Sequence, residues 1–312
     1  MSGFAARRIR DVRVGPVGLG AMPLSIERRP DEARAFATVH AALDAGVTLI
    51  DTADSYHWHA DERGHNEELI ARAIAAYGGD TSDVLVATKG GRGRPGDGSW
   101  TVDGTPEHLK RACEESLRRL GGEAIGLYQL HKPDPRVPFA ESIGALRELL
   151  DAGTIRMAGV SNVDADQIRQ ADEILGGRLA SVQNEYSPAV RDSAAELRLC
   201  DELGIAFLPW SPLGGISRSS LDAPPTVADG IPAPAPAPTP APSHAPPFAA
   251  FHEIARDRGV SPQRIALAWL LAKSPVVVPI PGASRPGTIR DSAAAGEVTL
   301  TADEFARLDA AR

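Results

Sequence analysis

Residues 47–56 of this chain read VTLIDTADSY, an apolar run that ends in Asp51 and is followed five residues later by Tyr56. Two further apolar runs, VLVATK and IGLYQLH, end in Lys89 and His131. If these runs are neighbouring parallel strands, their carboxyl ends meet at one rim and bring together a carboxylate, a phenol, an ammonium and an imidazole. Such a set predicts a proton-donating site rather than a packing motif.

Strand-like runs alternate with helix-like segments along the chain, which predicts βα units and a parallel sheet. A doubly wound sheet usually has about six strands, whereas a barrel has eight and needs about 250 residues. The 312 residues are sufficient for a barrel with extensions, so we expect a single (β/α)8 TIM-barrel domain over residues 1–312. The eight candidate strands lie at residues 17–19, 47–50, 84–88, 125–130, 155–160, 180–183, 206–209 and 276–280.

Capping residues mark where several of the intervening helices begin. Asp31 precedes an amphipathic segment, and a residue that favours helix starts stands directly before proline in Thr105-Pro106 and Ser261-Pro262. The capping-box pattern Thr301–Glu304 opens a further helix beyond the eighth strand, so we expect a C-terminal extra helix. The segment before Val17 is expected to form a short hairpin over the bottom of the barrel.

Residues 222–247 interrupt the alternation with a Pro/Ala-rich stretch between the seventh strand and the next helix. Ten of the 26 prolines lie in it, and because proline lacks an N–H the stretch cannot form a helix or a central strand. We expect a flexible, solvated insertion attached to the catalytic rim. A lid or a docking arm is the alternative.

Composition excludes several classes of function. The net charge of −8, without a basic stripe, argues against nucleic-acid binding. No run approaches 18 apolar residues, so we expect no membrane span, and the N-terminus lacks the apolar region of a secretory signal. The two cysteines, Cys113 and Cys200, lie far apart in helical segments, which indicates buried, inert thiols in a reducing, cytoplasmic compartment.

Three other patterns have simpler interpretations than a site. His57, His59 and His65 match no zinc-ligand spacing, so we expect no metal site. Residues 91–96 match Gly-x-Gly-x-x-Gly, but no helix is predicted after them, which favours a loop over a dinucleotide fingerprint. Trp269 is expected in the core on a helix face.

The remaining strand ends carry neutral polar groups and one aromatic residue. Ser161-Asn162 follows the fifth strand, Gln183 ends the sixth, and Trp210-Ser211 follows the seventh. Amides and hydroxyls suit a carboxamide, and a flat aromatic ring suits stacking on a nicotinamide.

Six strings, taken together and in order, resemble the aldo-keto reductase superfamily: DTADSY (51–56), ATKG (87–90), LYQLH (127–131), GVSN (159–162), WSPLG (210–214) and IPGA (280–283). The resemblance covers the chain from about residue 10 to residue 312. Residues 127–135 and 181–186 are most similar to bacterial reductases of pyridoxal and assorted aldehydes.

The resemblance implies a barrel that binds NADPH in extended form, with NADH less favoured, and a catalytic tetrad of Asp51, Tyr56, Lys89 and His131. Tyr56 is the implied general acid. Many relatives have lysine where this chain has Gly282, so the adenosine 2′-phosphate must rely on Arg285, Arg290 or Arg218. Trp58 and Trp100 are expected to shape the substrate pocket. The implied cofactor-binding residues are Ser161, Asn162, Gln183, Trp210, Ser211, Leu213, Gly215, Gly282, Ser284, Arg285, Thr288, Asp291 and Ser292.

The sequence therefore predicts NADPH-dependent reduction of an aldehyde or ketone, with a small-molecule carbonyl as partner and a monomer or weak oligomer as the assembly. A nucleotide-bound, redox-sensing interaction protein that docks through its Pro-rich segment is the alternative. A sugar-phosphate isomerase barrel is a third possibility, against which the carboxamide-binding set counts.

Overall fold

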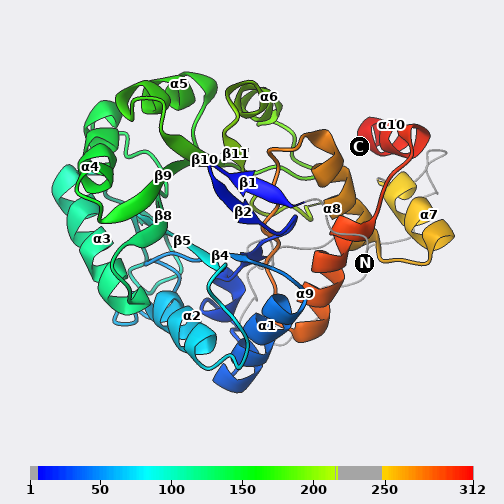
Figure 1. The fold of residues 1–312 in the computed structure, drawn as a ribbon, viewed down its shortest axis with the longest axis horizontal. Coiled ribbons are helices and arrows are strands. Elements are labelled where there is room, and N and C mark those ends of the chain that lie inside the picture. The colour runs from blue at the N-terminus through cyan, green and yellow to red at the C-terminus, as the bar shows by residue number, and fades with distance from the viewer. Residues whose placement is uncertain (1–5, 215, 217–247, 312) are drawn as a thin grey trace, which may run out of the picture.

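The computed structural model describes residues 6–214, 216 and 248–311. At its centre lies a curled parallel sheet with the strand order β11-β10-β9-β8-β5-β4-β3, around which the helices form a ring (Figure 1). Each strand pairs with the strands before and after it among the βα units, as expected for a barrel. The strands are β3 (Leu19–Gly20), β4 (Leu49–Asp51), β5 (Leu85–Gly90), β8 (Ile125–Leu130), β9 (Ile155–Ser161), β10 (Leu179–Gln183) and β11 (Ala206–Phe207).

Residues 276–282 close the sheet by hydrogen bonding to both of its edges. On one side Phe207 N donates to the Val276 carbonyl at 2.9 Å, and on the other Gly18 N donates to the Pro279 carbonyl at 2.9 Å. The predicted eighth strand is thus at the expected place, but it forms only isolated bridges to its neighbours. Pro279 and Pro281 lack an N–H, which prevents a continuous ladder.

The helices follow the strands and cover the outside of the sheet. They are α1 (Glu32–Asp44), α2 (His65–Ala75), α3 (Pro106–Leu120), α4 (Phe139–Asp151), α5 (Ala165–Ile174), α6 (Ala194–Leu203), α7 (Ala249–Arg258), α8 (Pro262–Lys273), α9 (Pro286–Ala293) and α10 (Ala302–Ala310), with short 3-10 turns at Met22–Leu24 and Ala294–Glu297. Trp269 on α8 is fully buried, as predicted, and stacks on Tyr186 with ring centroids 6.0 Å apart.

Most of the predicted helix caps are confirmed. Asp31 accepts from Arg34 N, Ser261 accepts from Arg264 N, and Thr301 forms a capping box that opens α10, the expected C-terminal helix. Thr105 stands at the expected N-cap position of α3 but makes no side-chain cap bond. Its hydroxyl donates to Asp103 at 2.7 Å instead.

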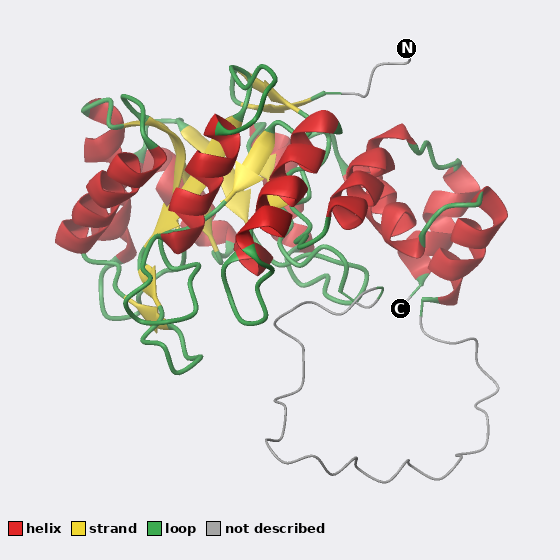
Figure 2. Cartoon of the chain, turned by 90° about the horizontal axis from the view of Figure 1, so that it is seen from below, coloured by secondary structure: helices red, strands yellow, loops and turns green. Residues whose placement is uncertain are grey.

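Two small antiparallel hairpins lie at opposite ends of the barrel (Figure 2). The predicted N-terminal hairpin, β1 (Arg7–Ile9) with β2 (Val12–Val14), packs Ile9 and Val14 against the residues that begin the barrel strands. The other hairpin, β6 (Arg92–Gly93) with β7 (Thr101–Val102), follows β5. It confirms that residues 91–96 precede no helix, because α3 begins only at Pro106.

The Pro/Ala-rich stretch 222–247 lies outside the described residues. Within the described part of the chain, no helix is both long and apolar enough to cross a membrane.

Candidate active site

Four side chains from three adjacent barrel strands meet at the carboxyl rim, as predicted. Asp51 is the last residue of β4, Lys89 lies one residue before the end of β5, and His131 follows β8 directly. Tyr56 reaches the same place from the loop after β4. All four are almost fully buried, with exposures of 2% for Asp51, 0% for Lys89, 7% for Tyr56 and 5% for His131.

Lys89 joins the carboxylate to the phenol. Its Nζ donates to Asp51 Oδ2 at 2.6 Å, to the Tyr56 hydroxyl oxygen at 3.0 Å and to the Thr52 carbonyl at 2.9 Å. A lysine ammonium has three donors, so these three acceptors satisfy it completely. The phenol oxygen is therefore held at one position beside a fixed positive charge.

The pKa values of this buried pair differ in part from the sequence expectation. Burial raises the pKa of the Tyr56 phenol, and although Lys89 pulls it down, the net pKa lies above its ordinary value. Burial alone lowers the pKa of Lys89, but Asp51 and Tyr56 bring it above its ordinary value. Both groups are therefore protonated at neutral pH. Lys89 lowers the pKa of Tyr56 as predicted, but the effect of burial is larger.

His131 is a neutral imidazole at neutral pH. Burial, together with the charges of Lys89 and Arg92, holds its pKa well below the ordinary value. Its ring meets the Tyr56 ring edge-on, with centroids 5.6 Å apart, and its Nδ1 lies 3.4 Å from the Ser55 hydroxyl. A neutral imidazole in this position can donate a hydrogen bond to a carbonyl oxygen next to the Tyr56 hydroxyl.

The predicted carboxamide-binding residues lie side by side at the ends of β9 and β10. Ser161 donates to the Gln183 carbonyl at 2.6 Å, and the Asn162 amide nitrogen donates to the His131 carbonyl at 2.9 Å. Asn162 is held with φ of 58°, a left-handed conformation that asparagine tolerates better than most residues. Gln183 also reaches the tetrad, because its Nε2 donates to Asp51 Oδ1 at 2.7 Å. Trp210 N pairs with the Asn184 carbonyl at 3.1 Å.

The other predicted cofactor residues lie on two segments. Ser211, with φ of 47°, and Leu213 follow β11, and Gly215 lies outside the described residues. The second group comprises Gly282, Ser284 and Arg285, which precede α9, and Thr288, Asp291 and Ser292, which lie within it. Arg285 is the exposed N-cap residue of α9.

Three members of this second group have surroundings that the sequence did not predict. A Cβ at Gly282 would lie 2.9 Å from the ring of Pro23, so a lysine side chain at this position would require a shift. Asp291 is ion-paired with Arg264 at 2.7 Å, and Ser292 is 2% exposed.

The β6–β7 hairpin adds a cluster of cations and indole rings beside the tetrad. Trp100 meets the His131 ring at 6.3 Å, the Arg92 guanidinium lies 4.5 Å from the Trp100 ring centroid, and Arg94 lies between Trp100 and Trp58 at 4.6 and 5.4 Å. The two tryptophans were predicted at the pocket, but the arginines were not. Both arginines stand in the loop directly after Lys89, and that position is the sequence feature that could have indicated them.

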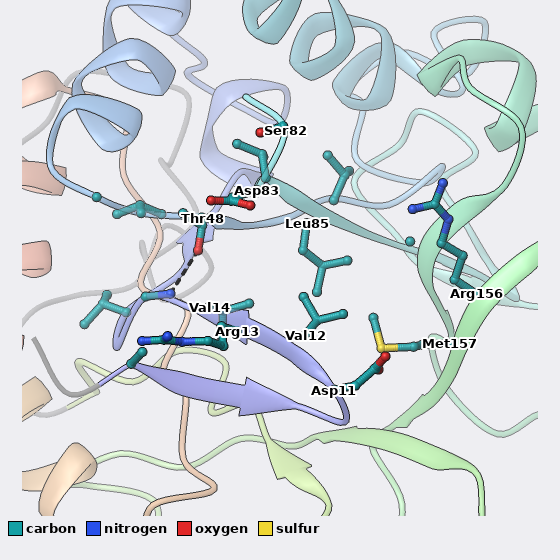
Figure 3. Close-up of a pocket in the computed structure, with 18 of the residues that line it drawn as sticks. Asp11, Val12, Arg13, Val14, Thr48, Ser82, Asp83, Leu85, Arg156 and Met157 are labelled. Atoms are coloured by element: carbon teal, nitrogen blue, oxygen red, sulfur yellow. Dashed lines mark hydrogen bonds between the residues drawn. The ribbon is translucent and has the colours of Figure 1, made fainter. Parts of the chain in front are cut away.

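A cavity of about 1000 Å³ lies at the opposite end of the barrel from the tetrad (Figure 3). It is bordered by Val12 and Arg13 of the N-terminal hairpin and by residues that begin the barrel strands, among them Thr48, Leu85 and Arg156. No member of the tetrad lines it. Barrel enzymes carry their chemistry at the carboxyl ends of the strands, so this cavity is not the candidate active site.

Comparison with known proteins agrees with this geometry. The family model described as the aldo/keto reductase family matches residues 16–312. The chain belongs to the aldo/keto reductase family. It is 31% identical over 306 residues to an uncharacterized oxidoreductase of Schizosaccharomyces pombe, covering 97% of this chain and 88% of that protein.

Two solved structures extend the comparison to three dimensions. The glycerol dehydrogenase of Gluconobacter oxydans superposes with a TM-score of 0.79 at 29% identity, covering 99% of this chain and 95% of that one. An aldo-keto reductase of Klebsiella pneumoniae in complex with NADPH superposes with a TM-score of 0.70 at 27% identity, covering 95% and 90%. The protein is thus an oxidoreductase of this family with the family's barrel.

Proposed function

We propose that this aldo-keto reductase reduces an aldehyde or ketone to an alcohol with NADPH, and that Tyr56 is the general acid. The observation that carries the proposal is the buried chain Asp51–Lys89–Tyr56, in which one ammonium bridges a carboxylate and a phenol. When bound, the reduced nicotinamide supplies the hydride that adds to the carbonyl carbon.

The tetrad then completes the reduction at the carbonyl oxygen. His131 N–H and the Tyr56 hydroxyl orient that oxygen from two sides. As negative charge develops on it, the Tyr56 proton moves to the oxygen, and the product is the alcohol. Lys89, held by Asp51, stabilises the phenolate that remains on Tyr56. The positive charge is already in place before reaction, so no reorganisation is needed at the transition state.

Residues at the ends of β9 and β10 fit the nicotinamide end of the cofactor. The Oδ1 of Asn162 accepts no hydrogen bond from the described residues, and the Asn162 amide nitrogen is already engaged by backbone. The buried Trp210 Nε1 has no partner among the described residues, so an acceptor on a ligand would satisfy it. For the 2′-phosphate we infer a role of Arg285, which forms no ion pair within the described part of the chain and starts α9, where N–H groups favour an anion.

The cofactor assignment is tested by titrating the protein with NADPH and NADH and following tryptophan fluorescence, to which Trp210 contributes. We expect NADPH to bind at least about tenfold more tightly than NADH, because a phosphate held by a guanidinium is a charge-assisted interaction. Arg285→Gln should reduce this preference. Binding of neither nucleotide would refute the proposed function.

The role of Tyr56 is tested by Tyr56→Phe, which deletes only the hydroxyl. We expect kcat for carbonyl reduction to fall about 10²- to 10⁴-fold, the usual contribution of a general acid, with the Kd for NADPH essentially unchanged. Tyr77→Phe, which removes a phenol hydroxyl bonded to Asp44 on the protein surface, is the matched control. Near-normal turnover by Tyr56→Phe would overturn the assignment.

A panel of aldehydes that includes pyridoxal tests the finer subgroup. We propose membership of the bacterial pyridoxal and aldehyde reductase group on the strings at residues 127–135 and 181–186. Turnover of pyridoxal at least comparable to that of simple benzaldehydes is the expected result.

A further inference from the structure

Arg92 lies one aromatic ring away from the reaction centre. It follows β5 by two residues and starts the β6–β7 hairpin, where it pairs in register with Val102. Its guanidinium sits over the Trp100 ring at 4.5 Å, and that ring meets His131 edge-on at 6.3 Å. The positive charge is therefore fixed beside His131, whose ring contacts the ring of Tyr56.

The two arginines of this hairpin differ in how their charges are compensated. Arg94 forms an ion pair with Glu27 and also donates to the His57 carbonyl at 3.2 Å. Arg92 has no carboxylate within ion-pair distance among the described residues. The Nε of both arginines is buried without a hydrogen-bond partner there, so the missing ion pair is what distinguishes Arg92. The nearby tetrad carboxylate, Asp51, is occupied by Lys89 and Gln183.

An uncompensated, partly buried guanidinium is costly, because it has lost water without gaining an anion. Burial lowers the pKa of Arg92, as expected for a cation in this position. Its charge also acts on the active site, since it offsets a small part of the rise in the pKa of Tyr56 and helps to lower the pKa of His131. Stacking on Trp100 accounts for one face of the guanidinium, but the described residues supply no acceptor for its buried Nε.

We propose that Arg92 binds an anionic group of the substrate, so that the carbonyl compounds this enzyme prefers carry a carboxylate or a phosphate near the aldehyde or ketone. This inference rests on the proposed reductase function and names the substrate class of the same site. The guanidinium supplies paired N–H donors that match either anion, and Trp100 holds it at a fixed position relative to His131. Carbonyl and anion are thus bound at two ends of one substrate.

Matched pairs of substrates test the proposal. We would measure kcat/KM with NADPH for 4-carboxybenzaldehyde against its methyl ester, methyl 4-formylbenzoate, and for 4-formylphenyl phosphate against 4-methoxybenzaldehyde. The wild type should prefer at least one of the two charged members by about 10- to 100-fold, mainly through KM, and the pair that responds identifies the anion. A ratio near one for both pairs in the wild type would overturn the proposal.

Variants of Arg92 separate anion binding from a structural role. In Arg92→Gln the ratio of charged to neutral substrate should fall towards one. In Arg92→Lys, which keeps the charge but loses the planar fork, it should be intermediate. Arg156→Gln removes the same charge at the opposite end of the barrel (Figure 3) and should retain the wild-type ratio. If Arg92 only holds the hairpin, Arg92→Gln lowers both rates in proportion and leaves the ratio unchanged, which overturns the proposal.

A binding measurement distinguishes failure of this inference from failure of the reductase assignment. Terephthalate is titrated into the protein with NADP⁺ present, and tryptophan fluorescence is followed, because Trp100 lies under the guanidinium. Saturable quenching that weakens about tenfold or more in Arg92→Gln supports the anion site even if no carbonyl is reduced. Quenching that is equal in the wild type and in Arg92→Gln refutes the anion site even if aldehydes are turned over.

Discussion

The buried pair Asp51–Lys89 should show strong energetic coupling in a double-mutant cycle. The perturbations are Lys89→Met, Asp51→Asn and the two together. Lys89→Met leaves the Asp51 carboxylate buried with a single side-chain donor, Gln183 Nε2 at 2.7 Å. Asp51→Asn leaves the Lys89 ammonium with two neutral acceptors, the Thr52 carbonyl and the Tyr56 hydroxyl.

The magnitude follows from the burial of both partners, which are 0% and 2% exposed. Removing one member of a buried ion pair typically costs about 3–5 kcal/mol, because the remaining charge is desolvated and uncompensated. Removing both charges together avoids that cost, and such a replacement often changes the free energy of unfolding little. We therefore expect each single variant to lose about 3–5 kcal/mol of unfolding free energy. The double variant should lose far less than the sum of the two single losses.

The assay is equilibrium urea unfolding at neutral pH, followed by far-UV circular dichroism and by tryptophan fluorescence, with coincident transitions required. The same cycle on the exposed pair Glu32–Arg72, which also has short contacts of 2.8 and 2.9 Å, should show little coupling. Additive effects of Lys89→Met and Asp51→Asn, within about 0.5 kcal/mol, would refute the reasoning.

Three further predictions concern pH, packing and thiol chemistry. Since the pKa of Tyr56 lies above its ordinary value, the phenol stays protonated through neutral pH. We therefore expect kcat/KM to be constant there and to fall only as pH rises through an alkaline pKa. An inflection of kcat/KM near pH 6.5 would contradict this. Gly20→Ala places a Cβ 2.7 Å from the carbonyl oxygen of Ile280, in the segment that closes the barrel. It should lower the free energy of unfolding by about 1–3 kcal/mol, measured by thermal or urea unfolding. Gly78→Ala, whose Cβ would have nothing within 4 Å, should not. Burial raises the pKa values of the Cys113 and Cys200 thiols to about 12, so Ellman's reagent should modify neither in the native protein and both after unfolding in urea; rapid modification of the native protein would show that these thiols are accessible.

The order of the elements and the identity of the candidate site followed from local sequence. Apolar runs such as 125–130 predicted their strands because strand periodicity and length are properties of a short segment. Caps such as Asp31 act on the next turn of the same helix, so they are also visible in sequence. The position of Asp51, Lys89 and His131 at strand ends was sufficient to predict that they meet, since parallel strands share one carboxyl rim.

Other features depend on atoms brought together from distant segments, and the tertiary structure alone decided them. The net rise in the pKa of Tyr56 reflects its burial. How far burial outweighs the Lys89 charge is set by the fold and not by residue type. Residues 276–282 close the barrel through the backbone groups that can still form hydrogen bonds beside its prolines. These groups must face the strands at both edges of the sheet, which only the fold determines. Arg92 stands near Lys89 in sequence, but only the fold shows that its charge is stacked beside His131 without a described acidic partner. Sequence determined which groups reach the rim, and packing determined their distances, solvation and charge.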